Sequence, residues 1–265
     1  HRYETYSDYL AEDERFYIIN AGTPGYTSLQ GKEYLKLVLH ELAQAGVSPY
    51  VVTVYFGNND RTWNDNIRDH YVLPDSKFKL HLIRMAEVLL KAFWVVERVP
   101  PGEFAANLEE VIELCRSRGM KVILIEPVVP RSWPPGLRAT DLESERADFL
   151  RRAAGTRVAT LLSQAIKNYD QGMVELSNHQ EAEAEVLLHR AIEEDFVLPR
   201  ISDEYKQALR DLAQRENVPI ISVEQEIPLD DTEYFCDYTH PIGSANQLIA
   251  NSLLQQILDL LIQDE

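Results

Sequence analysis

Four short apolar runs, separated by helix-like segments, most constrain what this 265-residue chain can fold into. The runs are FYIINAG (16–22), YVVTVYFG (50–57), KVILIEPVV (121–129) and VPIISVEQ (218–225). Short, nearly continuous apolar runs are typical of strands buried on both faces. Amphipathic helical patterns at 31–46, 106–119 and 203–217 precede the last three runs. This alternation predicts an α/β domain whose parallel sheet is covered by helices on both sides.

A long apolar segment at 77–101 interrupts that alternation. It reads KFKLHLIRMAEVLLKAFWVVERVPP and ends in a pair of prolines, which predicts a helix that stops there. We expect this helix to pack against the core, and the alternative is that it forms a pocket wall or lid.

A second interruption, at 140–200, is polar, rich in alanine and helical in pattern. Gly172, Ala184, Leu188 and Ala191 have the small-residue spacing of a tetratricopeptide helix pair. Because one such unit cannot stack into a solenoid, we expect a helical hairpin packed beside the main domain; the alternative is a peptide-binding groove. The predicted division is therefore a main domain of 1–139 and 201–265 with an insertion at 140–200.

The composition excludes several classes of function. A formal charge of −17 leaves no basic stripe for a phosphate backbone, so we do not expect a nucleic-acid partner. Two widely separated cysteines match neither a metal site nor a disulfide framework. No window approaches 18 uninterrupted apolar residues, so no membrane span is expected in this chain. The start, HRYETYSDYL, lacks both an initiator Met and the layout of a signal peptide, and we expect the natural chain to begin earlier.

Candidate chemistry begins with Asp237 and His240 in the stretch DYTHP. A His acting as a general base needs a carboxylate that fixes its tautomer and stabilises the imidazolium, and a spacing of three residues in a tight turn can supply one. A structural turn would explain the same spacing. Further site residues are therefore needed before a function is inferred.

Two loops at the carboxyl ends of predicted strands supply such residues. GNND, at Gly57, Asn58, Asn59 and Asp60, follows the second strand, and NAGTPGYTS (20–28) ends the first. An Asn amide or a glycine N–H at this edge can donate to a developing oxyanion, although both stretches also suit plain turns. The prediction rests on all three loops meeting at one edge of one sheet.

With these stretches in view, the sequence resembles the SGNH or GDSL hydrolase family. NAGTPGYTS looks like the second conserved block of that family, FGNND like the third and DYTHP like the fifth. The resemblance implies a three-layer α/β/α, flavodoxin-like sheet with His240 as general base and Asp237 orienting it. It also implies that Gly25 and Asn59 are oxyanion donors, supported by Asn20, Gly57 and Asn58 in the same loops. The stretch EEDFVLPRISDEYKQALRDLAQRENVPIISV is similar to a bacterial subgroup that carries a short tetratricopeptide-like hairpin before the last strand.

The first block of the family, a strand followed by Gly-Asp-Ser with the nucleophilic serine, is absent from this chain. Ser7 matches a position downstream of that serine and has no strand before it, so we expect no nucleophile within this chain. In the order 2-1-3-4-5 the first strand lies between the second and third, and its loss would leave two ladders unpaired. We favour a strand and serine that precede residue 1. The alternatives are a cleaved segment that stays associated, or a strand from residues 1–10 or from another chain that fills the gap in a pseudoenzyme.

These expectations lead to a serine ester hydrolase or acyl transferase that works through an acyl-enzyme. The alternative is a catalytically inactive domain of the same fold that binds a protein or glycan partner. The enzyme would act on a small acyl ester or an acylated glycan without a metal or organic cofactor, and the helical insertion could bind a protein partner. Members of this family are often exported or anchored by a segment upstream, so the compartment stays open.

Overall fold

The computed structural model describes residues 5–63, 97–136, 151, 153–198 and 200–263. Most of the predicted helix at 77–101 lies outside these residues, as does the part of the insertion at 140–150. In the described part of the chain, no helix is both long enough and apolar enough to cross a membrane.

A parallel sheet of order β1-β2-β3 lies at the centre of the described residues. Its strands are β1 (Val51–Val54), β2 (Lys121–Ile125) and β3 (Ile220–Ile221). Val52 is level with Val122, and Leu124 is level with Ile220. The predicted parallel α/β sheet is therefore confirmed, with each strand shorter than the apolar run that contains it.

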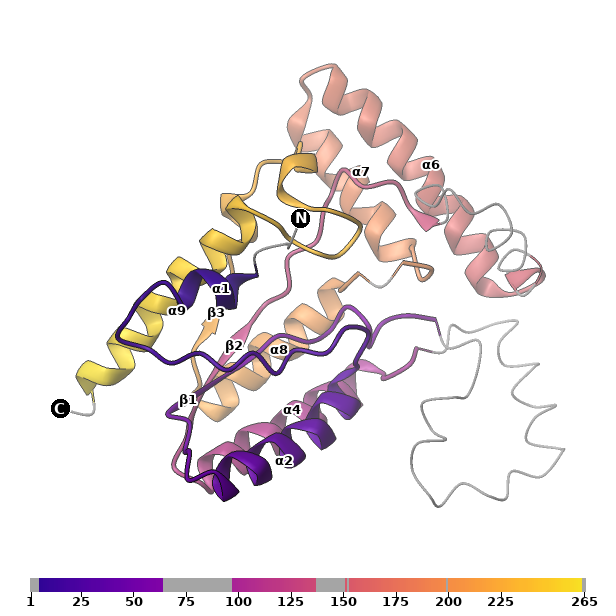
Figure 1. The fold of residues 1–265 in the computed structure, drawn as a ribbon. Helices are drawn as coiled ribbons and strands as arrows, with labels where there is room; N and C mark the ends of the chain where they lie inside the picture. Colours follow the sequence, from indigo (N-terminus) through magenta and orange to yellow (C-terminus); the bar gives the residue numbers. More distant parts are fainter. Residues whose placement is uncertain (1–4, 64–96, 137–150, 152, 199, 264–265) are drawn as a thin grey trace, which may run out of the picture.

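Helices cover both faces of this sheet (Figure 1). Val122 and Leu124 belong to a core cluster shared with α2, α4 and α8, whereas Ile123 and Ile125 belong to one shared with α1 and α9. Successive residues of a strand point to opposite faces, so β2 supplies both cores. The helices of the first face are α2 (Ser28–Gln44), α4 (Pro101–Arg116) and α8 (Asp203–Glu216). Those of the second are α1 (Tyr6–Leu10) and α9 (Ser244–Gln263), and two short 3₁₀ turns, η3 (Glu224–Glu226) and η4 (Thr232–Tyr234), precede α9.

The first predicted strand, at 16–22, is wrong: these residues form neither strand nor helix. Phe16 and Ile18 pack against the core beside α9, but Tyr17 is 89% exposed and Ile19 is 42% exposed. The segment alternates as a strand would, yet among the described residues no neighbouring strand pairs with it. An apolar run without a ladder partner cannot become a sheet strand, because its backbone groups have nothing to bond.

The segment predicted to be an insertion contains a helical hairpin of α6 (Arg157–Ser177) and α7 (Glu181–Glu194). Its two helices pack closely against each other, and a β-carbon added to Gly172 would lie 2.9 Å from Leu188 Cγ. Ala184, Leu188 and Ala191 are buried, so the small-residue pattern marks the contact between the helices. Whether this hairpin is of the tetratricopeptide type stays a prediction.

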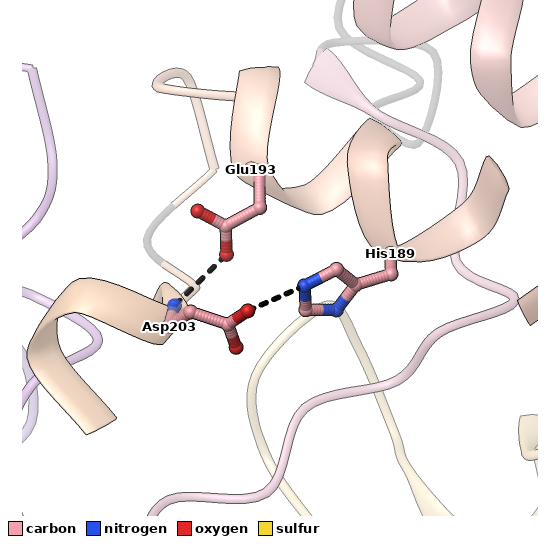
Figure 2. Close-up of side chains that lie close together, drawn as sticks. All are labelled: His189, Glu193 and Asp203. Atoms are coloured by element: carbon pink, nitrogen blue, oxygen red, sulfur yellow. Dashed lines mark hydrogen bonds and ion pairs between the residues drawn. The ribbon is translucent and has the colours of Figure 1, made fainter. Parts of the chain in front are cut away.

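The hairpin meets α8 at a polar joint (Figure 2). His189 and Glu193 lie one turn apart on α7 and face Asp203, the first residue of α8. His189 Nε2 lies 2.8 Å from Asp203 Oδ2, and the Asp203 N–H donates to Glu193 Oε1 at 2.9 Å. The acceptor satisfies an N–H at the start of α8 that has no partner within the helix.

Candidate active site

Asp237 and His240 form a hydrogen-bonded pair. His240 Nδ1 lies 2.8 Å from Asp237 Oδ2 and 3.0 Å from Oδ1. Among the described residues no partner is found for Nε2, and the His240 side chain is 61% exposed. An imidazole held at Nδ1 by a carboxylate, with Nε2 accessible, has the arrangement that general-base catalysis needs.

The Asp237 carboxylate also shapes the turn that carries this pair. Its Oδ1 accepts the N–H groups of Thr239 and His240, each at 2.9 Å. Asp side chains commonly accept N–H groups two or three residues ahead, and this makes them good turn formers. One side chain therefore fixes both the backbone and the imidazole.

The ends of this turn are anchored in the body of the protein. Phe235 and Pro241 form an antiparallel bridge, and Phe235 is buried in the core beside α9. Asn246, in the first turn of α9, donates to the Pro241 carbonyl at 2.7 Å. The imidazole is thus exposed on a loop whose ends are held by hydrogen bonds and by the packing of Phe235.

The charges of the pair support each other. The hydrogen bond to Asp237 raises the pKa of His240, against the opposing effect of burial. Burial tends to raise the pKa of Asp237, but the hydrogen bonds from His240 and Thr239 outweigh it, and the net pKa is lowered. Asp237 is therefore ionised at neutral pH and stabilises the protonated form of His240.

Gly25 and Asn59, the two predicted oxyanion donors, are brought next to each other. Thr23 to Tyr26 form a turn closed by the Tyr26 N–H on the Thr23 carbonyl at 3.4 Å. Pro24 and Gly25 occupy its centre, and Gly25 has a φ of +79°, as the third position of a type II turn requires. Asn59 Nδ2 donates to the Tyr26 carbonyl at 3.2 Å, so the two loops touch at the residue after Gly25.

Both donor groups keep hydrogen-bonding capacity. An Asn amide has two N–H groups, and the bond to Tyr26 uses one of them. In the described residues the N–H of Gly25 has no hydrogen-bond partner. The Gly25 N–H and one N–H of the Asn59 amide are therefore both available as donors beside this turn.

The Asp60 side chain connects the same two loops by hydrogen bonds to Ser28. Its buried carboxylate accepts the Ser28 hydroxyl at 2.6 Å and the Ser28 N–H at 2.9 Å. Asn107 on α4 donates to the same hydroxyl at 3.1 Å. Burial raises the pKa of Asp60 to about 6, although the hydrogen bonds from Ser28 oppose that shift. The carboxylate lies at the positive end of α2, where a negative charge is favoured.

Ser7 and Asn20 make a separate contact. Asn20 Nδ2 donates to Ser7 Oγ at 3.0 Å, and Asn20 Oδ1 accepts the Gly22 N–H at 2.9 Å. Ser7 Oγ also lies 2.6 Å from the hydroxyl oxygen of Thr5. Among the described residues the partners of Ser7 are thus a hydroxyl and an amide, with no imidazole to activate it.

The general base, its carboxylate and the two predicted oxyanion donors thus fall into two groups. Asp237 pairs with His240, and Asn59 meets the loop of Gly25. Within the described ranges no hydrogen bond or ion pair joins one group to the other.

Comparison with known protein families decides the wider assignment. Residues 1–189 match the model of the GDSL-like lipase/acylhydrolase family. The chain belongs to this family. The match contains the loops of Gly25 and Asn59 and ends before Asp237 and His240. A search of curated proteins found no match.

Membership of the GDSL-like family confirms the resemblance drawn from the sequence, together with the flavodoxin-like fold. It supports a hydrolase as the general activity. The catalytic roles of His240 and Asp237, and of Gly25 and Asn59, stay predictions.

Sequence reasoning missed two residues that organise this site, Ser28 and Arg61. Ser28 is the buried partner of Asp60, and Arg61 is a buried cation directly after it. An Arg that follows a strand-ending turn is usually exposed, so no local pattern predicts its burial.

One group of side chains in the described residues could hold a metal ion. The ligand atoms of His189, Glu193 and Asp203, drawn in Figure 2, lie within 4.8 Å of one another. The His189 and Asp203 side chains are 41% and 64% exposed and already bond each other. These contacts are accounted for by the joint between α7 and α8.

Proposed function

We propose that this GDSL-like protein is a serine hydrolase that cleaves an ester, or transfers its acyl group, through an acyl-enzyme. The observation that carries the proposal is the Asp237–His240 pair, with Nδ1 on the carboxylate and Nε2 accessible. In the first step a serine Oγ attacks the ester carbonyl and its proton passes to Nε2 of His240. The same proton then goes to the departing alkoxide, and water or an acceptor hydroxyl releases the acyl group in the reverse sequence.

Gly25 and Asn59 would bind the oxyanion of the tetrahedral intermediate. Their contact through the Tyr26 carbonyl supports this role, because two donors must converge on one oxygen. Loss of one such donor typically lowers kcat by about 10²- to 10³-fold. The substrate class that fits is a small acyl ester or the acyl group of an acylated glycan.

The nucleophilic serine would come from a strand that precedes residue 1. In the described residues β1 pairs with β2 alone, so one edge of β1 has no partner. Phe16 and Ile18 pack on the same core as Val51 and Tyr55 of the β1 region, so the 16–22 segment and β1 contribute to the same face of the sheet. A strand between β1 and this segment would pair both, and its carboxyl end would lie beside the GNND loop.

A fluorophosphonate that traps activated serines tests the proposal directly on the natural full-length protein. We expect one adduct, located by peptide mass spectrometry on a serine N-terminal to His1. An adduct on Ser7, or the absence of any adduct together with no ester turnover, would overturn it. The second of these results would favour a binding domain that has kept the fold.

The substitution Asp237→Asn should shift the pH profile of turnover. Only neutral His240 accepts a proton, so activity falls as the pH drops below the pKa of His240, which Asp237 raises. Removing the carboxylate charge lowers that pKa, so the rising limb of kcat/KM should move to lower pH. The value of kcat/KM on the high-pH plateau should drop by about 10²- to 10⁴-fold, because the tautomer of the His240 imidazole is no longer fixed. An unchanged limb in a pH titration of kcat/KM would refute the role of Asp237.

A further inference from the structure

The four consecutive residues 58–61, which follow β1, make hydrogen bonds to two neighbouring parts of the protein. Asn59 and Asp60 bond to the loop of Gly25, through Tyr26 and Ser28. Asn58 and Arg61 instead bond to the connection between α7 and α8, which includes Asp195, Phe196, Arg200 and Ile201. The GNND loop therefore lies between the loop of Gly25 and the end of the helical hairpin.

Arg61 is held by carbonyl groups at the end of α7 and in the connection that follows it. Its Nη1 donates to the carbonyls of Ile192 at 2.8 Å, Arg200 at 3.0 Å and Asp195 at 3.2 Å, and Nη2 donates to that of Glu193. The last carbonyls of a helix lack partners within it and carry partial negative charge. The Arg61 guanidinium supplies these carbonyls with hydrogen-bond donors and with a positive charge. It does so inside the protein, since only 2% of the residue is exposed.

Two further contacts fix the same boundary. Asn58 Oδ1 accepts the Ile201 N–H at 2.8 Å, and the Trp63 N–H donates to the Phe196 carbonyl at 3.1 Å. The Arg61 guanidinium also stacks on the Phe196 ring, 4.5 Å from its centre. Guanidinium groups combine planar stacking with fork-like donation, so the position of Arg61 is defined in several directions.

The connection between α7 and α8 is itself fixed from the far side, by the loop after β2. Arg200 Nη2 bonds to Asp195 Oδ2 at 2.8 Å, and both side chains are buried. Asp195 also accepts the Gly136 N–H at 2.9 Å, and Arg200 Nη1 donates to the Trp133 carbonyl at 3.2 Å. The connection that bonds to the GNND loop is therefore itself hydrogen-bonded to the loop after β2.

We propose that Arg61 is a positioning residue, which uses the end of the hairpin to hold Asn59 in the orientation that binds the oxyanion. The inference rests on the proposed function. It assigns the hairpin insertion a part in the site, since the end of α7 supports the loop that carries the donor. Arg61 itself touches neither substrate nor reacting atoms.

A double-mutant cycle tests this role in the natural full-length protein. We expect Arg61→Lys, which keeps the charge but loses the fork, to lower kcat by about tenfold or more, with KM changed by less than about threefold. In an Asn59→Ala background the same substitution should change kcat by less than about twofold, because Arg61 acts through Asn59. Equal losses in both backgrounds, or an unchanged kcat in Arg61→Lys, would overturn the proposal.

Two companion variants separate positioning from general damage. Asn58→Ala removes the acceptor for the Ile201 N–H and should lower kcat with little change in KM, as Arg61→Lys does. It therefore provides the same test if Arg61→Lys does not fold. His189→Ala is the matched control: it breaks a contact of α7 with α8 that does not reach the GNND loop. Its kcat should stay within about twofold of the wild type. A loss as large as that of Arg61→Lys would overturn the proposal.

A readout without turnover distinguishes failure of this inference from failure of the proposed function. If the wild type neither turns over esters nor reacts with the fluorophosphonate, the proposed function has failed. The side-chain amide signal of Asn59 in a nitrogen–proton correlation spectrum still reports its position. We expect this signal to shift in Arg61→Lys and Asn58→Ala but not in His189→Ala. An unshifted signal in the first two would refute the positioning role.

Discussion

His240→Ala is expected to lower kcat/KM for ester hydrolysis by about 10⁴- to 10⁶-fold, as in other sites where a serine, a histidine and an aspartate act as a unit. The reason is that the proton of the attacking serine would have no acceptor, while the hydrogen bonds to the oxyanion stay in place. The substitution should leave the fold intact, because the His240 side chain is 61% exposed. Hydrolysis of a chromogenic acetate ester by the natural full-length protein measures the loss.

His40→Ala provides the control for this prediction. His40 is an exposed histidine of α2 whose ring bonds to Gln44 on the same helix. It should leave kcat/KM unchanged within about twofold. A loss below about tenfold in His240→Ala would contradict the assignment of His240 as general base, whatever the family of the protein.

The sequence predicted those parts of the fold that depend on local periodicity. The runs that contain β1, β2 and β3 are apolar on both faces because helices cover both, and this burial is visible in the residues themselves. The pairing of Asp237 with His240 also follows from a local feature, because a tight turn can bring side chains three residues apart into contact.

The wrong prediction of a strand at 16–22 has a different origin. Apolar composition reports that a segment tends to be buried, but a strand also needs a neighbour with free N–H and C=O groups. Tyr17 and Ile19 are exposed while Phe16 and Ile18 pack against the core, which is the alternation of a strand, but among the described residues no strand pairs with this segment. Local periodicity therefore shows which side chains of the segment are buried, but it does not show whether a neighbouring strand is present to pair with it.

The contacts that organise the site depend on long-range geometry. Arg61 bonds to carbonyls more than a hundred positions ahead in the chain, and Asp60 bonds to Ser28 across another element. The sequence around Arg61 does not distinguish a buried guanidinium from an exposed one, because Arg61 is buried by contact with the end of α7, which is distant in the chain. The family resemblance identified the loops, and the side chains that hold those loops became visible only in three dimensions.

Gly57→Ala is expected to destabilise the protein by about 2 to 4 kcal/mol, through backbone strain and overpacking together. Gly57 has a φ of +133°, a conformation that side-chain-bearing residues rarely adopt. An added β-carbon would lie 2.6 Å from Ile201 Cδ1, and Ile201 is only 1% exposed. Urea unfolding followed by circular dichroism measures the loss as a lower midpoint at constant slope.

Gly119→Ala is the matched control, because it isolates the cost of backbone conformation from that of contact. Gly119 has a φ of +75°, and an added β-carbon would meet nothing within 4 Å. It should therefore lose only about 1 to 2 kcal/mol. Gly57→Ala should also lower kcat by about tenfold or more, since relief of the contact with Ile201 displaces the loop that carries Asn59. Equal losses of stability in the two variants, with kcat unchanged, would show that the loop can move away from Ile201 without cost to the site.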